Sequence, residues 1–255
     1  MKKNYFLILL LLITAVFSST AQSKDSDLKP VSPAPKNDTI VKTIWYLGVG
    51  GNFNSTWIIS SNTYGEPSLN HQFSPGIVAN FNLGFDYNKH FGFKTELGFA
   101  TMGEKSEGTQ YGLAVDRTIK LNYFVFPVMM KYRTGGKLCF YVMAGPEFAL
   151  LLSATQTYTR DGVTAPPYEN PQQGLIDVSK SNIKDRYTGA ALCGRIDAGV
   201  EYSASRHFMF NVGLSTLYSI TDLNGYAWRF HPTEGNYPIS HNFYLGLNLG
   251  LNYKF

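Results

Sequence analysis

The residue types in this chain that most often carry out chemistry are five histidines and two cysteines. The histidines are His71, His90, His207, His231 and His241, and the cysteines are Cys139 and Cys193. No HxH, HExxH or CxxC spacing, which would bring two metal ligands onto one face, occurs among them. The pattern therefore predicts no metal site and no cofactor.

Ser240 stands beside His241, and a serine with a histidine base is the pair used by membrane-embedded barrels that modify lipids. Adjacent side chains on a strand point to opposite faces, so this pair would need other partners to act. No other motif supports nucleophilic catalysis. The simpler interpretation is that both are ordinary residues near a strand end, and the chain is not an enzyme.

Six charged residues lie on the polar faces of segments in which every second residue is apolar. They are Lys94, Glu96, Glu147, Arg195, Asp197 and Glu201. An enclosed charge without a partner is costly, so opposite signs are expected to meet across a common interior. We interpret the six as a structural charge network that fills this interior. The alternative is a narrow polar conduit.

The elements that must position these charges follow a period of two residues. Phe81, Leu83, Phe85 and Tyr87 alternate with polar or small residues, and "LGLNLGLNYKF" at 245–255 has the same alternation. Successive side chains of a strand point to opposite faces, so this pattern predicts strands with one apolar side. Eight are expected, at about 41–54, 74–87, 91–103, 117–133, 137–154, 188–203, 207–221 and 241–255. The stretch 138–152 is a rival transmembrane helix, but Gly145-Pro146-Glu147 interrupts it.

The connections between these strands alternate in length. Short turns are expected at 88–90, 134–136 and 204–206, and long polar loops at 55–73, 104–116, 155–187 and 222–240. Short turns at one end and long loops at the other are typical of bacterial outer-membrane barrels. The sequence therefore predicts an all-β fold, an eight-stranded antiparallel up-and-down transmembrane β-barrel.

Alternation alone does not say whether the apolar face points inward, as in a soluble lipocalin-like barrel, or outward to lipid. Long strands, charges on the polar face and aromatic residues at the strand ends favour lipid. Tyr253 and the final Phe255 resemble the recognition signal of proteins that the barrel-assembly machinery inserts into the outer membrane. The expected location is the cell outer membrane of a Gram-negative bacterium, with its lipid as a partner.

The first 21 residues are typical of a secretory signal peptide: Lys2 and Lys3 precede an apolar stretch that ends near small residues. The alternative, a membrane anchor helix, needs more than about 13 apolar residues. Residues 22–39 are polar and rich in proline, which predicts a flexible periplasmic leader before a barrel at 40–255. The net charge of +4 includes no basic run, so nucleic acid is not an expected partner.

Export permits disulfides, so Cys139 and Cys193 could pair. The expected strands place them near opposite ends of neighbouring strands, whereas a bridge needs Cα atoms within about 7 Å. We therefore expect two free thiols.

The stretch "LNYFVFPVMMKYRTGGKLCFYVMAGPEFALLLS" (121–153) and the hairpin at 197–224 resemble the PorT-like outer-membrane β-barrel family. The resemblance implies an outer-membrane barrel, and PorT itself is tied to protein secretion across that membrane. The motifs that carry it build barrels and include no catalytic signature.

The function expected from these patterns is a non-enzymatic structural or interaction role through long extracellular loops, especially 155–187. The alternative, suggested by the resemblance, is an accessory barrel of a protein secretion or envelope-assembly complex. A lipid-modifying enzyme and a narrow channel are lesser alternatives. Expected partners are the barrel-assembly machinery during insertion and secretion-complex or extracellular proteins.

Overall fold

A computed structural model describes residues 43–59, 70–110, 113–164, 168–170, 174–176, 181–229 and 239–255. The signal peptide and leader expected at 1–39 lie outside these residues, as do Pro166, Pro167 and Pro171 of the long loop. Those expectations therefore stay predictions.

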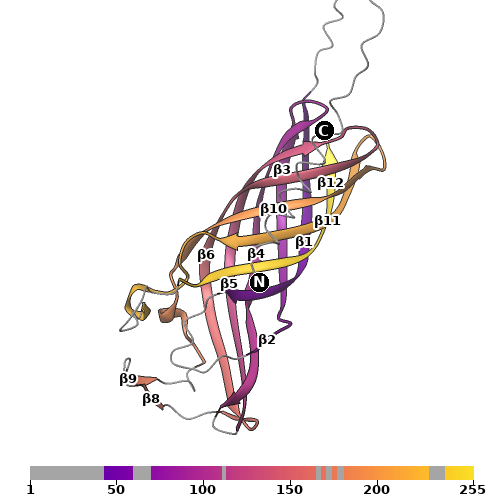
Figure 1. Cartoon of the computed structure of the whole chain (residues 1–255). Coiled ribbons are helices and arrows are strands. Elements are labelled where there is room, and N and C mark those ends of the chain that lie inside the picture. Colours follow the sequence, from indigo (N-terminus) through magenta and orange to yellow (C-terminus); the bar gives the residue numbers. More distant parts are fainter. Residues whose placement is uncertain are drawn as a thin grey trace, which may run out of the picture. The chain divides into compact units, whose positions relative to one another are not determined.

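Eight long antiparallel strands form a closed ring (Figure 1). They are β1 (Ile44–Ile59), β3 (Pro75–Asp86), β4 (Phe91–Gln110), β5 (Leu113–Arg133), β6 (Leu138–Arg160), β10 (Ala190–Ser203), β11 (Phe208–Ser219) and β12 (His241–Lys254). Each pairs with the next of the eight, and β12 closes the ring on β1, from Tyr46 opposite Lys254 to Ile59 opposite His241. Closure leaves no unpaired strand edge, which lipid would not tolerate. The predicted eight-stranded antiparallel barrel is confirmed.

The remaining described elements are short. They are β2 (Asn70–Gln72), β7 (Val163–Thr164), β8 (Tyr168–Asn170), β9 (Gly174–Ile176) and the 3-10 turns η1 (Lys184–Arg186) and η2 (Tyr226–Trp228). Among the residues described, no helix has the length and apolar character needed to cross a membrane.

The large apolar side chains of the ring point outward. Phe81 and Phe140 are 71% and 69% exposed, whereas the inward Asn82 and Arg195 are 2% and 0% exposed. Burial alternates residue by residue along β3 and along most of β6, as the period of two requires. The outer surface is therefore an apolar band, and polar groups are enclosed.

Four strands run further toward the loop end than the sequence suggested. β1 continues past 54 to Ile59, so the predicted loop at 55–73 was placed to begin too early. β4 continues to Gln110 and β5 begins at Leu113, so the prediction of a loop at 104–116 is wrong. β6 continues past 154 to Arg160. The two-residue alternation continues in these parts of β4, β5 and β6, but their outward residues are polar. The loop was predicted because the segments are polar, although the alternation indicates strands. β4, β5 and β6 consequently project beyond the other five strands (Figure 1).

Candidate functional site

The guanidinium of Arg195, which is fully buried in the middle of the barrel, binds three carboxylates. It donates from Nη2 to Asp197 Oδ2 at 2.8 Å and from Nη1 to Glu96 Oε2 at 2.8 Å and Glu147 Oε2 at 3.3 Å. The three acids come from β10, β4 and β6, so one side chain ties together three strands of the ring. This is the central network.

Lys94 completes the central network, because its Nζ lies 2.8 Å from Glu96 Oε1. Asn80 also donates to Glu96, and the Ser215 hydroxyl donates to Asp197 at 2.6 Å. The network thus holds two cations against three carboxylates, and Glu147 has the longest contact of the three with Arg195.

Glu201, the sixth charged residue identified from sequence, does not join the central network. It lies nearer the short turns, with its Oε1 3.1 Å from Lys131 Nζ. Lys131 also binds Asp86 at 2.8 Å, and Arg133 binds Asp86 at 3.0 Å. Sequence reasoning missed Lys131, Arg133 and Asp86. The inward position of Lys131 in the period-two pattern of 117–133 was the signal that could have found the first of them.

The outer half of the lumen holds a large apolar cluster beside buried polar side chains such as Thr56, Ser219 and Asn242. Inward side chains of all eight ring strands and three residues of the loops form one buried cluster there. Its largest members include Ile58, Met102, Leu121, Tyr123, Leu151, Leu217 and Tyr244. Expecting only polar side chains inside was therefore incomplete. The segment 117–133, apolar on both faces in the sequence, contributes Ile119 and Val125 as well.

Two loop segments close the mouth at this end. Ile183, Tyr187 and Leu223 are 0%, 8% and 2% exposed and belong to the same apolar cluster. The Ile183 N–H donates to Ala154 O at 3.0 Å, and the Thr188 N–H donates to Leu223 O at 2.7 Å. The parts of the predicted loops 155–187 and 222–240 that the structure describes thus fold back onto the barrel as a mouth cap (181–189 and 222–224).

The part of the sheet that projects beyond the ring begins at a polar row. On the outward face Thr101 donates to Asn122 at 2.9 Å, and Asn122 donates to Ser153 at 2.9 Å. Phe99 and Phe124 pack edge to face just below this row, with ring centroids 5.7 Å apart. We take the row as the outer limit of the apolar band and call the sheet beyond it the extension (102–110, 113–121 and 154–160).

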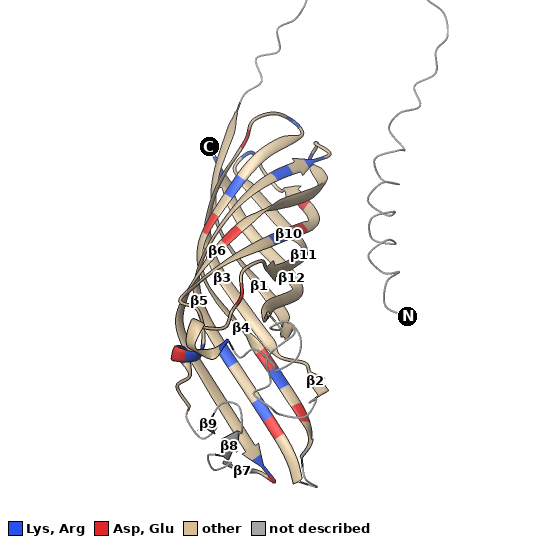
Figure 2. Cartoon of the chain, turned by 60° about the vertical axis from the view of Figure 1, so that its left-hand side comes forward, with Lys and Arg blue, Asp and Glu red and all other residues tan. Residues whose placement is uncertain are grey.

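Positive and negative residues are interspersed along the strands of the extension (Figure 2), and its outward face carries polar residues of both charges. Lys105 faces Thr118 across the strands, and Thr118 faces Thr157; Glu107 faces Asp116 in the next row. On the opposite face, Glu104 forms a buried ion pair with Arg117. The extension therefore has a sealed inner face and an accessible polar one.

Ser240 and His241, the candidate catalytic pair, each contact other residues. Ser240 is buried and its Oγ accepts a hydrogen bond from Asn224 Nδ2 at 2.9 Å. The His241 ring lies against Tyr218 and its Nδ1 is 2.7 Å from Ser219 O. Among the described residues no group of three or more His, Cys, Asp or Glu side chains could hold a metal ion. His231 lies outside the described residues.

The two cysteines are free and buried. Cys139 lies opposite Glu201 and Cys193 opposite Glu147 in the pairing of β6 with β10. Positions 139 and 147 are eight residues apart on β6, on the order of 27 Å at the rise of a strand. The separation is far beyond the reach of a disulfide.

Tyr253 and Phe255 lie at the short-turn end of β12. Their rings are 5.3 Å apart, and Phe208 packs against Tyr253 at 5.6 Å. The Phe255 N–H donates to Trp45 O at 2.9 Å, so the last residue is held against the first strand. These aromatic side chains are exposed on the outer surface, as an interfacial girdle requires.

Inward glycines make room for side chains of the neighbouring strands. Gly84 lies opposite Tyr46, and a Cβ on Gly84 would overlap the Tyr46 ring. Lys131 Nζ also lies over that ring, 4.6 Å from its centroid. The glycine therefore supports the position of the second charge cluster.

Gly84→Ala is expected to destabilise the barrel by about 1–3 kcal/mol, because the Tyr46 ring must move in a closely packed lumen. Urea unfolding in detergent micelles measures the change. The matched control is Gly194→Ala, since a Cβ there meets nothing within 4 Å; it should stay within about 0.5 kcal/mol of the parent. Equal stability of both variants would show that the ring is not confined.

The sequence and structure have counterparts among known proteins. Neisserial surface protein A is 10% identical, with 83% of this chain and 97% of that chain covered and a TM-score of 0.40. Ail of Yersinia pestis (10%, 83% and 99%, TM-score 0.38) and OprG of Pseudomonas aeruginosa (11%, 84% and 95%, TM-score 0.38) are also similar. At these values no ligand or partner carries over. No curated protein is significantly similar in sequence.

The individual solved structures are too dissimilar in sequence to assign this chain to a family, but a family model does assign it. The family model described as outer membrane protein beta-barrel domain matches residues 21–225, most of the 255-residue chain. The closed ring, its outward apolar band and its enclosed charges are the features such a domain requires. The chain belongs to the outer membrane protein beta-barrel domain family and is an integral protein of the outer membrane.

Proposed function

We propose that this protein is a closed, non-enzymatic outer-membrane barrel that presents the extension of β4, β5 and β6 to a protein partner outside the membrane. The single observation that carries the proposal is that three strands continue beyond the ring while the ring itself is filled. A barrel that passes solutes needs an open lumen. In this protein the lumen is filled by side chains, and three strands project beyond the ring as a surface.

The filling of the lumen supports a role other than transport. Arg195, Lys131 and Tyr244 are among the largest fully buried side chains, and they lie at different levels of the barrel. Tyr244 belongs to the apolar cluster, which also includes Ile183 and Leu223 of the mouth cap. Eight strands leave an interior that side chains can fill, and here they do so.

The edges of the extension support a surface built for contact and not for aggregation. β2 pairs with β4 along one edge, from Asn70 opposite Glu107 to Gln72 opposite Lys105. β7 and the bridge between Thr155 and Asn182 cover the edge of β6. Unpaired strand edges pair readily with strands of other chains. Because these edges are covered, the surface that remains for a partner is the outward face, where Thr157 is exposed.

Placing a photo-crosslinking amino acid at Thr157 in intact cells tests the proposal. We expect a discrete protein adduct there, and none with the same probe at Leu249, which is 59% exposed on the lipid-facing band. The purified chain in planar bilayers should show no conductance above background. A steady conductance, or the absence of any adduct at Thr157, would contradict the proposal.

The second candidate is an accessory role in a protein secretion or envelope-assembly complex. The stretch 121–153 that resembles PorT-like barrels lies in β5 and β6, two of the strands that form the extension. The identity of the crosslinked partner separates the two functions, because an envelope-assembly protein would favour the accessory role and a secreted or host protein the first.

A further inference from the structure

We propose that the barrel wall near the short turns binds a phospholipid with an anionic headgroup, its acyl chain in an outward hollow and its phosphate beside Lys137. The site is separate from the extension, and the proposal does not rest on the function given above. Short turns face the periplasm in barrels of this class, so the lipid belongs to the periplasmic leaflet.

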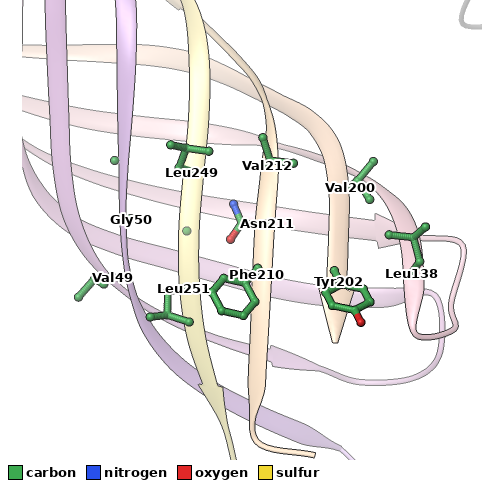
Figure 3. A pocket seen from close by; sticks show the side chains of 12 residues that line it. Val49, Gly50, Leu138, Val200, Tyr202, Phe210, Asn211, Val212, Leu249 and Leu251 are labelled. Atoms are coloured by element: carbon green, nitrogen blue, oxygen red, sulfur yellow. The ribbon is translucent and has the colours of Figure 1, made fainter. Parts of the chain in front are cut away.

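The hollow has a volume of about 660 Å³ and lies across β1, β12, β11, β10 and the start of β6. Figure 3 shows Leu251, Phe210 and Tyr202 side by side in one row, where they are paired on successive strands. In the next row Val212 and Val200 are smaller. The change from rings to short side chains leaves a depression, and its volume lies within the range of small-molecule sites.

The walls of this hollow are suited to an acyl chain. Leu138, Phe210, Val212 and Leu249 are each between 48% and 64% exposed on the outward face, and all are apolar. The strands cross the membrane, so the depression opens to lipid and not to water. The acyl chains of the surrounding lipid are therefore the groups that contact this surface.

A cation stands at the turn end of the hollow. Leu138 pairs with Tyr202, and Lys137, the residue before Leu138, holds its Nζ 5.5 Å from the centroid of the Tyr202 ring. The Ser203 N–H donates to Lys137 O at 2.7 Å, which fixes the backbone of this lysine. An ammonium beside an interfacial tyrosine is placed at headgroup depth.

The charge around this end favours an anion. Lys89, Lys137 and Arg206 are exposed there. Among the described residues at this end (43–46, 86–91, 132–138, 201–208 and 252–255) the acidic side chains are Asp86 and Glu201, which are buried against Lys131. The carboxylate of Phe255 is the remaining negative group. An apolar groove that ends beside exposed cations complements an anionic phospholipid.

Native mass spectrometry of the purified full chain tests the inference, with phosphatidylglycerol and zwitterionic phosphatidylcholine added in equal amounts to the detergent. The parent chain should retain phosphatidylglycerol preferentially. Lys137→Glu with Arg206→Glu should lower that retention at least tenfold, at about fivefold for each cation lost. Lys120→Glu, which reverses an exposed charge at the loop end, is the matched control and should change nothing.

Val212→Trp fills the hollow and should reduce retention of both lipids, and Val212→Leu should do so less. Resistance of the folded band to sodium dodecyl sulfate confirms that each variant has kept its barrel. Equal retention of the two lipids by the parent chain would overturn the inference. So would unchanged phosphatidylglycerol retention in the double variant, or a dimer that Val212→Trp abolishes while lipid binding is unaffected.

Discussion

Arg195→Met is expected to cost about 3–5 kcal/mol of stability, the largest loss of any single substitution in the central network. Methionine keeps much of the side-chain volume but removes the guanidinium that three buried carboxylates share. Lys94 remains on Glu96, whereas Asp197 and Glu147 lose their cation. Removing one partner of a buried ion pair is costly because the other charge stays enclosed without compensation. Urea unfolding in micelles, followed by tryptophan fluorescence, gives the value.

Two further variants separate charge balance from packing. Glu147→Gln should stay within about 1 kcal/mol of the parent, because the network holds three carboxylates and two cations and the amide oxygen can still accept from Arg195. Lys120→Met, at an exposed position, should be neutral. A loss in Glu147→Gln as large as that in Arg195→Met would mean that all three carboxylates are needed. A stable Arg195→Met barrel would show that the network contributes little.

The strands and their outward face were predictable because lipid and lumen impose opposite demands on successive residues. The outward residues that face lipid are apolar, for example Phe81, Leu83 and Phe85 on β3 and the leucines of β12. Gly145-Pro146-Glu147 excluded a helix at 138–152, and this stretch crosses as β6 with Glu147 turned inward and Phe148 outward. Alternation also brought Arg195 and Asp197 to one face, two residues apart on β10.

Other features depend on which distant residues meet, and a local period cannot report that. Glu201 joins Lys131 because β10 lies beside β6 and β6 beside β5 in the ring, a relation fixed only by register. The extension was missed because lipid no longer marks its outward face with apolar residues. The mouth cap was missed because Ile183 and Leu223 stand alone in polar segments, without a period to identify them as core.

Ile183→Asp is expected to release the mouth cap without unfolding the barrel. Ile183 is fully buried in the apolar cluster, and a carboxylate there costs several kcal/mol unless it reaches water. The described contacts of the segment with β6 include one bridge, a few backbone hydrogen bonds and the Arg186–Gln156 side-chain hydrogen bond, whereas the ring is closed by continuous pairing. The carboxylate therefore reaches water at lower free energy by local opening of the mouth cap than by unfolding of the barrel. Trypsin cleavage after Lys184 or Arg186 should rise on the order of a hundredfold, for about 3 kcal/mol of lost local stability.

Ser181→Asp is the matched control, because Ser181 is exposed two residues away and should leave the cleavage rate unchanged. Conductance of Ile183→Asp in planar bilayers should remain at background, since the network around Arg195 still fills the middle of the lumen. If the variant conducts, the mouth cap and not the charge network closes the barrel. If trypsin cuts it no faster than the parent, the cap is as stable as the ring itself.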